Sequence, residues 1–321
     1  MRILLTGATG FVGRRLAPYL LDRGHHVTAL VRPATSPAAV RQLQARGVEP
    51  IGEPTAALGE ADAVVHLAAA TRARTAQDFR RANVEGTRAL LTAAAALDTP
   101  PTVVLCSSLA AAGPSTPGRP RTEADPPAPV SDYGRSKLGA ETVVRGFAER
   151  VPAVIVRPPV VYGPGDTAFL PTLTAMVRAG VGVRPAGRAA YCLIHVDDLC
   201  AALTLALTAG HRVSPHNPVP GVYHACDGTP RTWPEICRHL ASALGRRAPL
   251  LLPLPRPVLH TAAALCELAV RPWGGQALLN RDKARELGQA SWTCSSDRAH
   301  TELDFVPQRV QLGAEFSAAL G

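Results

Sequence analysis

The stretch RILLTGATGFVG, residues 2–13, decides the fold of this chain. Its first five residues are mostly apolar and predict a buried strand, and glycines follow at positions 7, 10 and 13. The first glycine permits a tight turn, the second lets the backbone approach a pyrophosphate, and the third lets a helix pack on the strand. A helix that begins at Phe11 points unpaired N–H groups at that phosphate. The stretch therefore predicts a dinucleotide-binding unit.

Apolar runs alternate with Ala-, Leu- and Arg-rich segments over the following 140 or so residues. The predicted strands are Arg2–Thr6, Val27–Val31, Ala63–Leu67, Val103–Cys106 and Ala153–Arg157. The predicted helices are Phe11–Arg23, Pro37–Arg46, Ala76–Leu97 and Asp132–Arg150. Apolar strands separated by helices are typical of a parallel sheet that is covered on both faces. We therefore predict an α/β fold with a doubly wound Rossmann parallel sheet.

The pattern changes near Pro158, where proline-rich connections and shorter helical pieces begin. We expect residues 1–165 to form the dinucleotide-binding domain, to which a segment near 189–210 returns. Residues 166–321 should form mainly a smaller C-terminal α/β substrate-binding domain at the strand ends, with one more strand at Tyr191–His195. Residues 113–130 are rich in proline, serine, threonine and glycine, so we expect a surface loop there.

Composition argues against several other classes of protein. No apolar run reaches the ~20 residues of a membrane span, and the apolar stretch at the N-terminus is interrupted too early for a signal peptide. We therefore expect a cytoplasmic protein with no membrane partner. The seven cysteines are scattered without a C-x-x-C pair, which predicts reduced thiols and no metal site. The net charge of +9 is spread along the chain, which favours a phosphate-bearing ligand over nucleic acid.

The end of the second predicted strand bears on the choice of cofactor. An acidic residue about 20 positions after the glycine motif would bind the ribose of NAD. Here the strand Val27–Val31 is followed by Arg32 instead. A guanidinium at this place can pair with a 2′-phosphate, although it could also be a solvated charge. The sequence therefore favours NADP(H) and leaves NAD(H) open.

Three residues carry the predicted chemistry. Tyr133 and Lys137 are four positions apart near the start of a predicted helix, so both project from one face. A free phenol titrates near ~10, and a neighbouring ammonium lowers that pKa by stabilising the phenolate. Ser108 follows a predicted strand, where its hydroxyl can bind the same substrate oxygen. A Tyr-x-x-x-Lys pair is common by chance, so its weight comes from the glycine motif beside it.

Together these residues resemble the extended short-chain dehydrogenase/reductase family over nearly the whole chain. The matching motifs are TGATGFVG (6–13), HLAA (66–69), NVEGT (83–87), CSS (106–108), YGRSK (133–137), RPPVVYGPG (157–165) and HVDD (195–198). The resemblance implies that Tyr133 is the general acid/base, that Lys137 lowers its pKa and holds the nicotinamide ribose, and that Ser108 orients the reacting oxygen. It also implies that Asn83 joins the active-site hydrogen-bond network and that Ser107 is structural.

The motifs and the resemblance together assign a set of residues to the cofactor. These are Gly7, Thr9, Gly10, Phe11, Val12, Gly13, Arg32, Leu67, Ala68, Ala69, Tyr133, Lys137, Pro158 and Val160. Members of the family often pair two long helices per subunit, which here predicts a homodimer through 76–97 and 132–150.

Departures from the family pattern bear on the reaction. Sugar dehydratases need an acidic pair after the catalytic hydroxyl, but Leu109-Ala110-Ala111 follows Ser108. Nucleotide-sugar epimerases usually carry an asparagine where this chain has Val160, so a substrate diphosphate would lose its polar anchor. The sequence therefore favours an NADPH-dependent reductase of a small or medium, fairly hydrophobic ketone or aldehyde, close to the 3β-hydroxysteroid-dehydrogenase-like branch. Two alternatives stay open: an epimerase with tightly bound NAD+, and a non-catalytic NADP(H)-sensing protein.

Several other conspicuous residues are expected to be structural. His195 should pack the two parts of the chain together, and Asp197 and Asp198 should cap a helix. Cys192 and Cys200 are expected to be small buried apolar residues.

Overall fold

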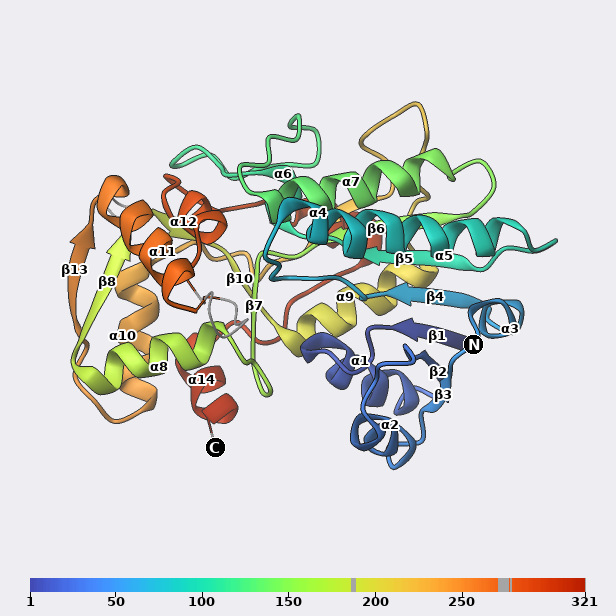
Figure 1. Cartoon of the computed structure of the whole chain (residues 1–321), viewed down its shortest axis with the longest axis horizontal. Helices are drawn as coiled ribbons and strands as arrows, with labels where there is room; N and C mark the ends of the chain where they lie inside the picture. Colours follow the sequence, from blue (N-terminus) through green and yellow to red (C-terminus); the bar gives the residue numbers. More distant parts are fainter. Residues whose placement is uncertain (186–188, 271–276, 278, 321) are drawn as a thin grey trace.

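A computed structural model describes residues 1–185, 189–270, 277 and 279–320. Its centre is a sheet of seven parallel strands in the order β11-β6-β5-β4-β1-β2-β3 (Figure 1). The strands are β1 Arg2–Thr6, β2 His26–Leu30, β3 Glu49–Ile51, β4 Ala63–His66, β5 Thr102–Cys106, β6 Ala153–Arg157 and β11 Val222–His224. The doubly wound Rossmann sheet predicted from the sequence is therefore confirmed.

The five predicted strands all form, with ends displaced by one residue at β2, β4 and β5. Two strands of the sheet were not predicted. Glu49–Ile51 is an edge strand of three residues with a proline at its centre, and Val222–His224 is equally short. Runs of this length carry too little periodicity to distinguish a strand from a loop.

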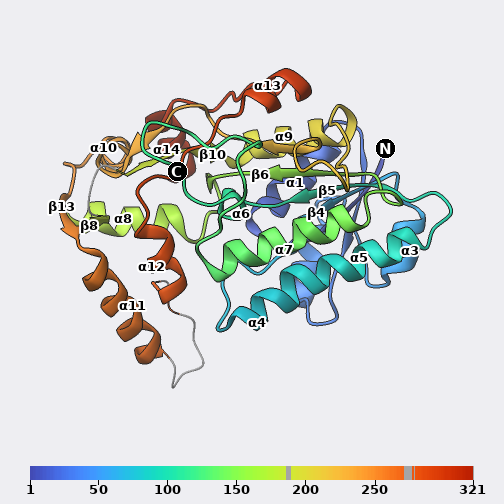
Figure 2. The same cartoon turned by 90° about the horizontal axis from the view of Figure 1, so that it is seen from above.

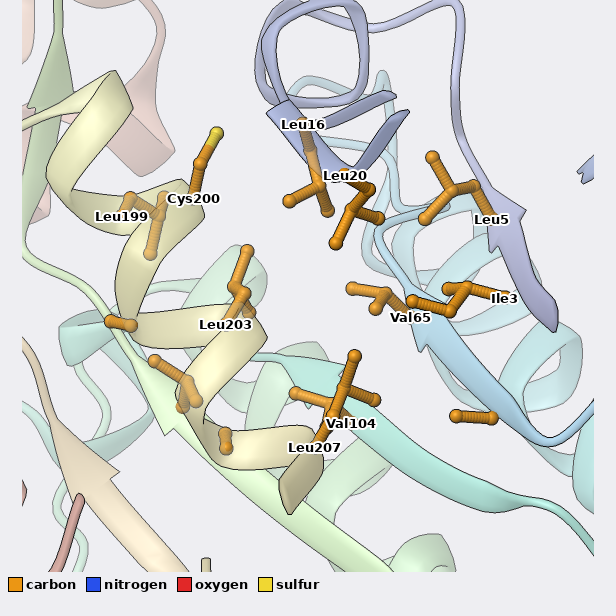
Figure 3. Packing of buried hydrophobic residues seen from close by; sticks show 14 of the residues in the cluster. Ile3, Leu5, Leu16, Leu20, Val65, Val104, Leu199, Cys200, Leu203 and Leu207 are labelled. Carbon is orange, nitrogen blue, oxygen red and sulfur yellow. The ribbon is translucent and has the colours of Figure 1, made fainter. Parts of the chain in front are cut away.

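Helices cover both faces of the sheet (Figure 2). The helices of this part are α1 Phe11–Leu21, α2 Pro37–Gln44, α3 Pro54–Gly59, α4 Ala76–Phe79, α5 Gly86–Ala95, α6 Leu109–Ala112, α7 Asp132–Gly146, α9 Val196–Thr208 and α13 Asp297–Leu303. Side chains alternate along each strand, so Ile3 and Leu5 pack with α1 and α9, as Figure 3 shows, whereas Leu4 packs with α5 and α7. Both faces are buried because the central positions of the inner strands are apolar, as in Ile3–Leu5 of β1 and Ala63–Val65 of β4.

The predicted helix Ala76–Leu97 contains an irregularity. It is formed by α4, a π-helical segment η1 at Arg80–Glu85, and α5. A π segment shifts the helical register and is often found at functional sites. Asn83 lies within it. The prediction of one regular helix was wrong in this detail, because the helical hydrophobic pattern does not reveal a local change in hydrogen bonding.

The remaining elements form a smaller lobe beyond the carboxyl ends of the strands (Figure 1). Its strands pair as β7 Val160–Tyr162 with β10 Leu193–His195, β8 Val181–Pro185 with β13 Leu250–Leu254, and β9 Ala190–Tyr191 with β12 Arg231–Thr232. Its helices are α8 Phe169–Ala179, α10 Trp233–Ala243, α11 Arg256–Val270, α12 Arg281–Leu287 and α14 Leu312–Leu320. The predicted strand Tyr191–His195 is split, because its two halves pair with different partners.

The chain passes between the two parts more than once. The helix α9 lies within the predicted returning segment 189–210 and packs on the large sheet, as does α13. The strand β11 is the edge strand of that sheet and pairs with β6. The boundary at residue 165 stays a prediction. Among the helices of the described ranges, none is long and apolar enough to cross a membrane.

Candidate active site

The glycine loop between β1 and α1 is packed so closely against backbone atoms that Gly7 and Gly13 cannot carry side chains. Gly7 has a φ of +72°, and a Cβ on it would lie 2.8 Å from the Ala68 nitrogen. A Cβ on Gly13 would collide with the carbonyl oxygen of Gly7. No side chain caps the N-terminus of α1 and no acidic residue lies in its first turn. The loop therefore fits a dinucleotide phosphate, which the N–H groups of that turn would hold.

The other residues assigned to the cofactor lie around this loop. Leu67, Ala68 and Ala69 follow β4, and the N–H of Ala68 donates to Thr6 Oγ1 at 3.1 Å. Arg32 lies exposed past the end of β2. Within the part of the chain that the structure describes, the Arg32 guanidinium makes no ion pair, so it is free to meet an anionic group.

Ser108, Tyr133 and Lys137 are brought together at the carboxyl end of β5. Ser108 caps the N-terminus of α6, and the interaction of its hydroxyl with Tyr133 lowers the pKa of the phenol. Lys137 is buried, and its Nζ donates to the carbonyl oxygen of Cys106 at 2.7 Å. The ring of Phe79 packs against that of Tyr133 with centroids 5.9 Å apart. The reactive phenol is therefore supported by three elements, α4, β5 and α7.

The acidity expected for Tyr133 is not found in the chain alone. Burial raises the pKa of Tyr133, and the hydrogen bond from Ser108 offsets only part of that effect. Burial also lowers the pKa of Lys137. The lowered phenol pKa expected from the sequence is not found here, because desolvation outweighs the effect of Ser108, and Lys137 Nζ donates to the carbonyl oxygen of Cys106. In this state the phenol is a proton donor.

Asn83 holds the site together from the side. Its Oδ1 accepts from the N–H of Ala70 at 2.7 Å, and its Nδ2 donates to the Ala70 carbonyl at 3.0 Å and to Ser136 Oγ at 2.8 Å. Ser136 Oγ in turn donates to the carbonyl oxygen of Tyr133. Both amide hydrogens of Asn83 are therefore used to fasten the loop after β4 to helix α7. This geometry fits a positioning residue.

His66 links the glycine loop to the same framework. Its Nδ1 lies 2.6 Å from Thr6 Oγ1 and its Nε2 lies 3.0 Å from Thr87 Oγ1. Thr87 Oγ1 donates to the backbone carbonyl of Asn83. Burial, with a further contribution from Lys137, lowers the pKa of His66 to about 3, so the ring is neutral at physiological pH. The sequence analysis quoted His66 within a motif but gave it no role.

A buried ion pair lies beneath Ser108. Arg157 and Glu141 form two hydrogen bonds, at 2.9 and 2.5 Å, and Ser107 Oγ donates to Glu141 at 2.5 Å. Burial alone would raise the pKa of Glu141, but Arg157 and Ser107 more than offset it and the pKa lies below its ordinary value. The carboxylate is therefore charged, and it ties β5, β6 and α7 together. Glu141 was not predicted, because no motif marks it.

The N-terminus of α7 is capped from the smaller lobe. The carboxylate of Asp282 accepts from the N–H groups of Asp132 and Tyr133 at 2.5 and 3.0 Å. Ser131 caps the same helix and donates to Glu286 at 2.7 Å. The segment that carries Tyr133 is therefore held by α12, which lies 150 residues further along the chain. No local pattern in the sequence indicates this contact, because its partners lie about 150 residues apart.

The loops after β6 and β7 complete the surroundings. The Pro158 carbonyl accepts from the N–H of Leu109 at 2.8 Å, and Val160 is partly buried at the start of β7. An open hollow of about 420 Å³ lies between the loop after β7 and α8, lined at the loop by Gly163, Gly165 and Asp166. The three catalytic candidates do not line it.

His195 is structural as expected, but the prediction that Asp197 and Asp198 cap the helix was wrong. His195 is buried and accepts from the N–H of Asp197, so the cap of α9 is His195 itself and not the two aspartates that follow it. Asp197 pairs with Arg15 of α1 at 2.7 Å. Asp198 accepts from two backbone N–H groups near the C-terminus.

Comparison with known proteins adds the family. The profile of the NAD dependent epimerase/dehydratase family matches residues 3–219. The chain is 34% identical over 301 residues to the ceramide reductase of Caulobacter vibrioides, covering 92% of this chain and 86% of that protein. It is 33% identical over 322 residues to 4-hydroxy-2-methyl-3-oxo-4-farnesyl-3,4-dihydroquinoline-1-oxide ketoreductase of Stigmatella aurantiaca, covering 90% and 92%.

Solved structures agree with this fold. The structure of the human epimerase family protein SDR39U1 with NADPH has a TM-score of 0.76 and 25% identity, and the match covers 100% of both chains. A UDP-glucuronic acid 4-epimerase from Bacillus cereus with NAD has a TM-score of 0.74, covering 100% and 99%, but its 21% identity supports the fold alone.

Proposed function

This chain belongs to the NAD dependent epimerase/dehydratase family and is an NAD(P)-dependent oxidoreductase of the short-chain dehydrogenase/reductase type, and from this premise we propose that it is a carbonyl reductase. Its substrate would be a small or medium, fairly hydrophobic ketone or aldehyde, and its cofactor NADPH. The observation that carries the proposal is the placement of Ser108, Tyr133 and Lys137 together at the carboxyl end of β5, where Lys137 Nζ donates to the carbonyl oxygen of Cys106.

In the proposed reaction Tyr133 donates its phenolic proton to the carbonyl oxygen. NADPH, when bound, supplies the hydride to the carbonyl carbon. Ser108 donates a hydrogen bond to the same oxygen and holds it near the phenol. The raised pKa of Tyr133 keeps the phenol protonated at neutral pH, which suits the direction of reduction. Lys137, on the same face of α7, stabilises the phenolate that remains after the transfer.

The cofactor preference rests on Arg32. Its exposed guanidinium follows β2, where a 2′-phosphate would lie beside the adenosine of a dinucleotide held by the glycine loop. Replacing Arg32 by aspartate should weaken NADPH binding and leave NADH binding less affected, as measured by calorimetry with both cofactors. Equal weakening of the two would argue against a 2′-phosphate contact.

The substrate class rests on the apolar residues near the site. Leu109-Ala110-Ala111 after Ser108 offers no acid for elimination, and Val160 offers no anchor for a diphosphate. The two relatives compared above are named as a ceramide reductase and as a ketoreductase of a farnesyl-bearing dihydroquinoline oxide. A neutral carbonyl substrate avoids the cost of burying a charged group without partners.

An absorbance assay of NADPH consumption with ketones, aldehydes and nucleotide sugars tests the proposal. Tyr133→Phe should lower kcat by about 10²–10⁴-fold while NADPH still binds. Tyr191→Phe is the matched control, because the Tyr191 hydroxyl is buried in the core of the smaller lobe and has no hydrogen-bond partner among the described residues. Full turnover by Tyr133→Phe would contradict the assignment of the acid.

The same assay separates the two other functions that the sequence left open. Purified protein that retains NAD+ and does not consume NADPH, but interconverts nucleotide sugars, would be an epimerase. Protein that binds NADPH and turns over no member of the panel would support a sensing role.

A further inference from the structure

Three cysteines that are far apart in the sequence meet behind the catalytic serine. Cys192 lies between β9 and β10, Cys226 follows β11, and Cys294 precedes α13. Their sulfur atoms all lie within 4.8 Å of one another. The three residues are 0%, 0% and 3% exposed. Sequence spacing predicted no such group, because each cysteine comes from a separate segment of the chain.

The arrangement of the sulfurs is close to that of a three-coordinate metal site. For three atoms at most 4.8 Å apart, some point lies within roughly 2.8 Å of all three, whereas a metal–thiolate bond to zinc measures about 2.3 Å. An inward movement of about 0.5 Å per sulfur would therefore close the site. A disulfide requires two sulfurs to approach to about 2.05 Å, which is a larger displacement.

The surroundings favour three ligands over four. Leu109, Ala112 and Trp292 form the apolar wall of the cluster. Among the described residues, no histidine or carboxylate completes the group. Structural zinc is almost always four-coordinate, so a site with three sulfurs and an apolar wall fits it poorly. Soft thiolate ligands also select monovalent copper, which accepts a lower coordination number.

The thiols are poorly satisfied without a ligand. The protonated thiols of Cys192 and Cys226 both donate to one acceptor, the carbonyl oxygen of Cys294, at 3.6 and 3.4 Å. Cys226 Sγ also lies 3.7 Å from Ser296 Oγ.

We propose that Cys192, Cys226 and Cys294 form a three-sulfur binding site for a soft monovalent metal ion, copper(I). The site is separate from the proposed reductase chemistry, although its wall includes α6, which begins directly after Ser108. Metal binding displaces protons from the thiols and so strengthens with rising pH.

The test uses the full chain, reduced and kept free of oxygen, with copper(I) supplied from a complex with the chelator bicinchoninate. We expect one equivalent of copper to transfer to the protein and X-ray absorption to show three sulfur neighbours. Cys226→Ser should weaken copper binding by more than about 100-fold, because losing a metal ligand costs more than losing a residue that only hydrogen-bonds to a ligand. Cys237→Ser is the matched control, because Cys237 is equally buried but lies in α10, away from the cluster.

Three results would overturn the proposal. One is failure of the wild-type chain to compete with the chelator, and another is unchanged binding by both Cys226→Ser and Cys192→Ala, each shown to be folded by circular dichroism. The third is zinc binding at least as tight as copper(I) binding. A thiol count on the reduced, denatured protein precedes the titration and should give all seven cysteines.

Discussion

The framework around Tyr133 and the outer surface of the smaller lobe are built in opposite ways. Around Tyr133, buried polar side chains such as Asn83 and Glu141 each make three hydrogen bonds to other elements. The paired strands β8 and β13 instead expose apolar side chains: Leu250 is 66% exposed and Leu252 is 51% exposed. Directional contacts hold the reactive groups in one geometry, whereas a surface without them tolerates change. The position of Tyr133 therefore depends on directional contacts with its neighbours, whereas the β8–β13 surface does not depend on such contacts.

The largest effect should come from the ion pair beneath the site. Glu141→Ala leaves Arg157 buried without its partner, so we expect a loss of about 3–5 kcal/mol in the free energy of unfolding. Urea unfolding followed by circular dichroism measures it. Glu149→Ala is the control, since the Glu149 side chain is 79% exposed and should change stability by less than about 0.5 kcal/mol. Similar losses for the two variants would remove the contrast between framework and surface.

A smaller loss is expected at Asn83. Asn83→Ala leaves the N–H and carbonyl of Ala70 without their partner, and because this loop is only partly buried and water can reach it, we expect a total loss of about 1–3 kcal/mol. Since Asn83 fastens α7, kcat should also fall, whereas a merely stabilising residue would leave kcat unchanged at temperatures where the variant is folded. Asn217→Ala, at an exposed position, serves as the comparison in both measurements.

Acid should destabilise the framework through His66. Its pKa is about 3 in the folded chain and near 6.5 when unfolded, so between these values the unfolded state binds the extra proton and stability falls as pH decreases. His66 contributes a slope of at most about 1.4 kcal/mol per pH unit to the free energy of unfolding. Its stabilising contribution is fully present above about pH 6.5. The free energy of unfolding, measured at several pH values, should fall less steeply with decreasing pH for His66→Gln, which can still hydrogen-bond, than for His216→Gln, where the ring is exposed. Identical slopes would mean that the buried ring is not the group that titrates.

The smallest effect is expected on the outer surface. Leu252→Lys should change the free energy of unfolding by no more than about 0.5 kcal/mol, because the side chain is half exposed and makes no directional contact. Thermal melts and the NADPH assay check this together. A large loss of stability there would show that the β8–β13 surface is covered by another element or partner in solution.

The large sheet and the candidate residues Ser108, Tyr133 and Lys137 could be predicted from the sequence because they depend on short-range patterns. The alternation of buried strands and helices is visible in windows of about 10–20 residues, and Tyr133 and Lys137 share one helix face by their spacing alone. The π segment at Arg80–Glu85 and the short strands β3 and β11 were not predicted, since their hydrogen bonding is not reflected in any periodicity of the sequence. The acidity of Tyr133 was also misjudged, because burial cannot be read from spacing.

By itself, the sequence determined the parallel sheet and the glycine turn at its first strand end and predicted the reactive groups, because each is encoded within one local segment. The tertiary structure alone decided how Asp282 caps the helix of Tyr133, how Glu141 meets Arg157 and how Cys192, Cys226 and Cys294 converge. These contacts join residues up to about 150 positions apart, and their energies depend on burial and distance, which exist only once the chain has folded.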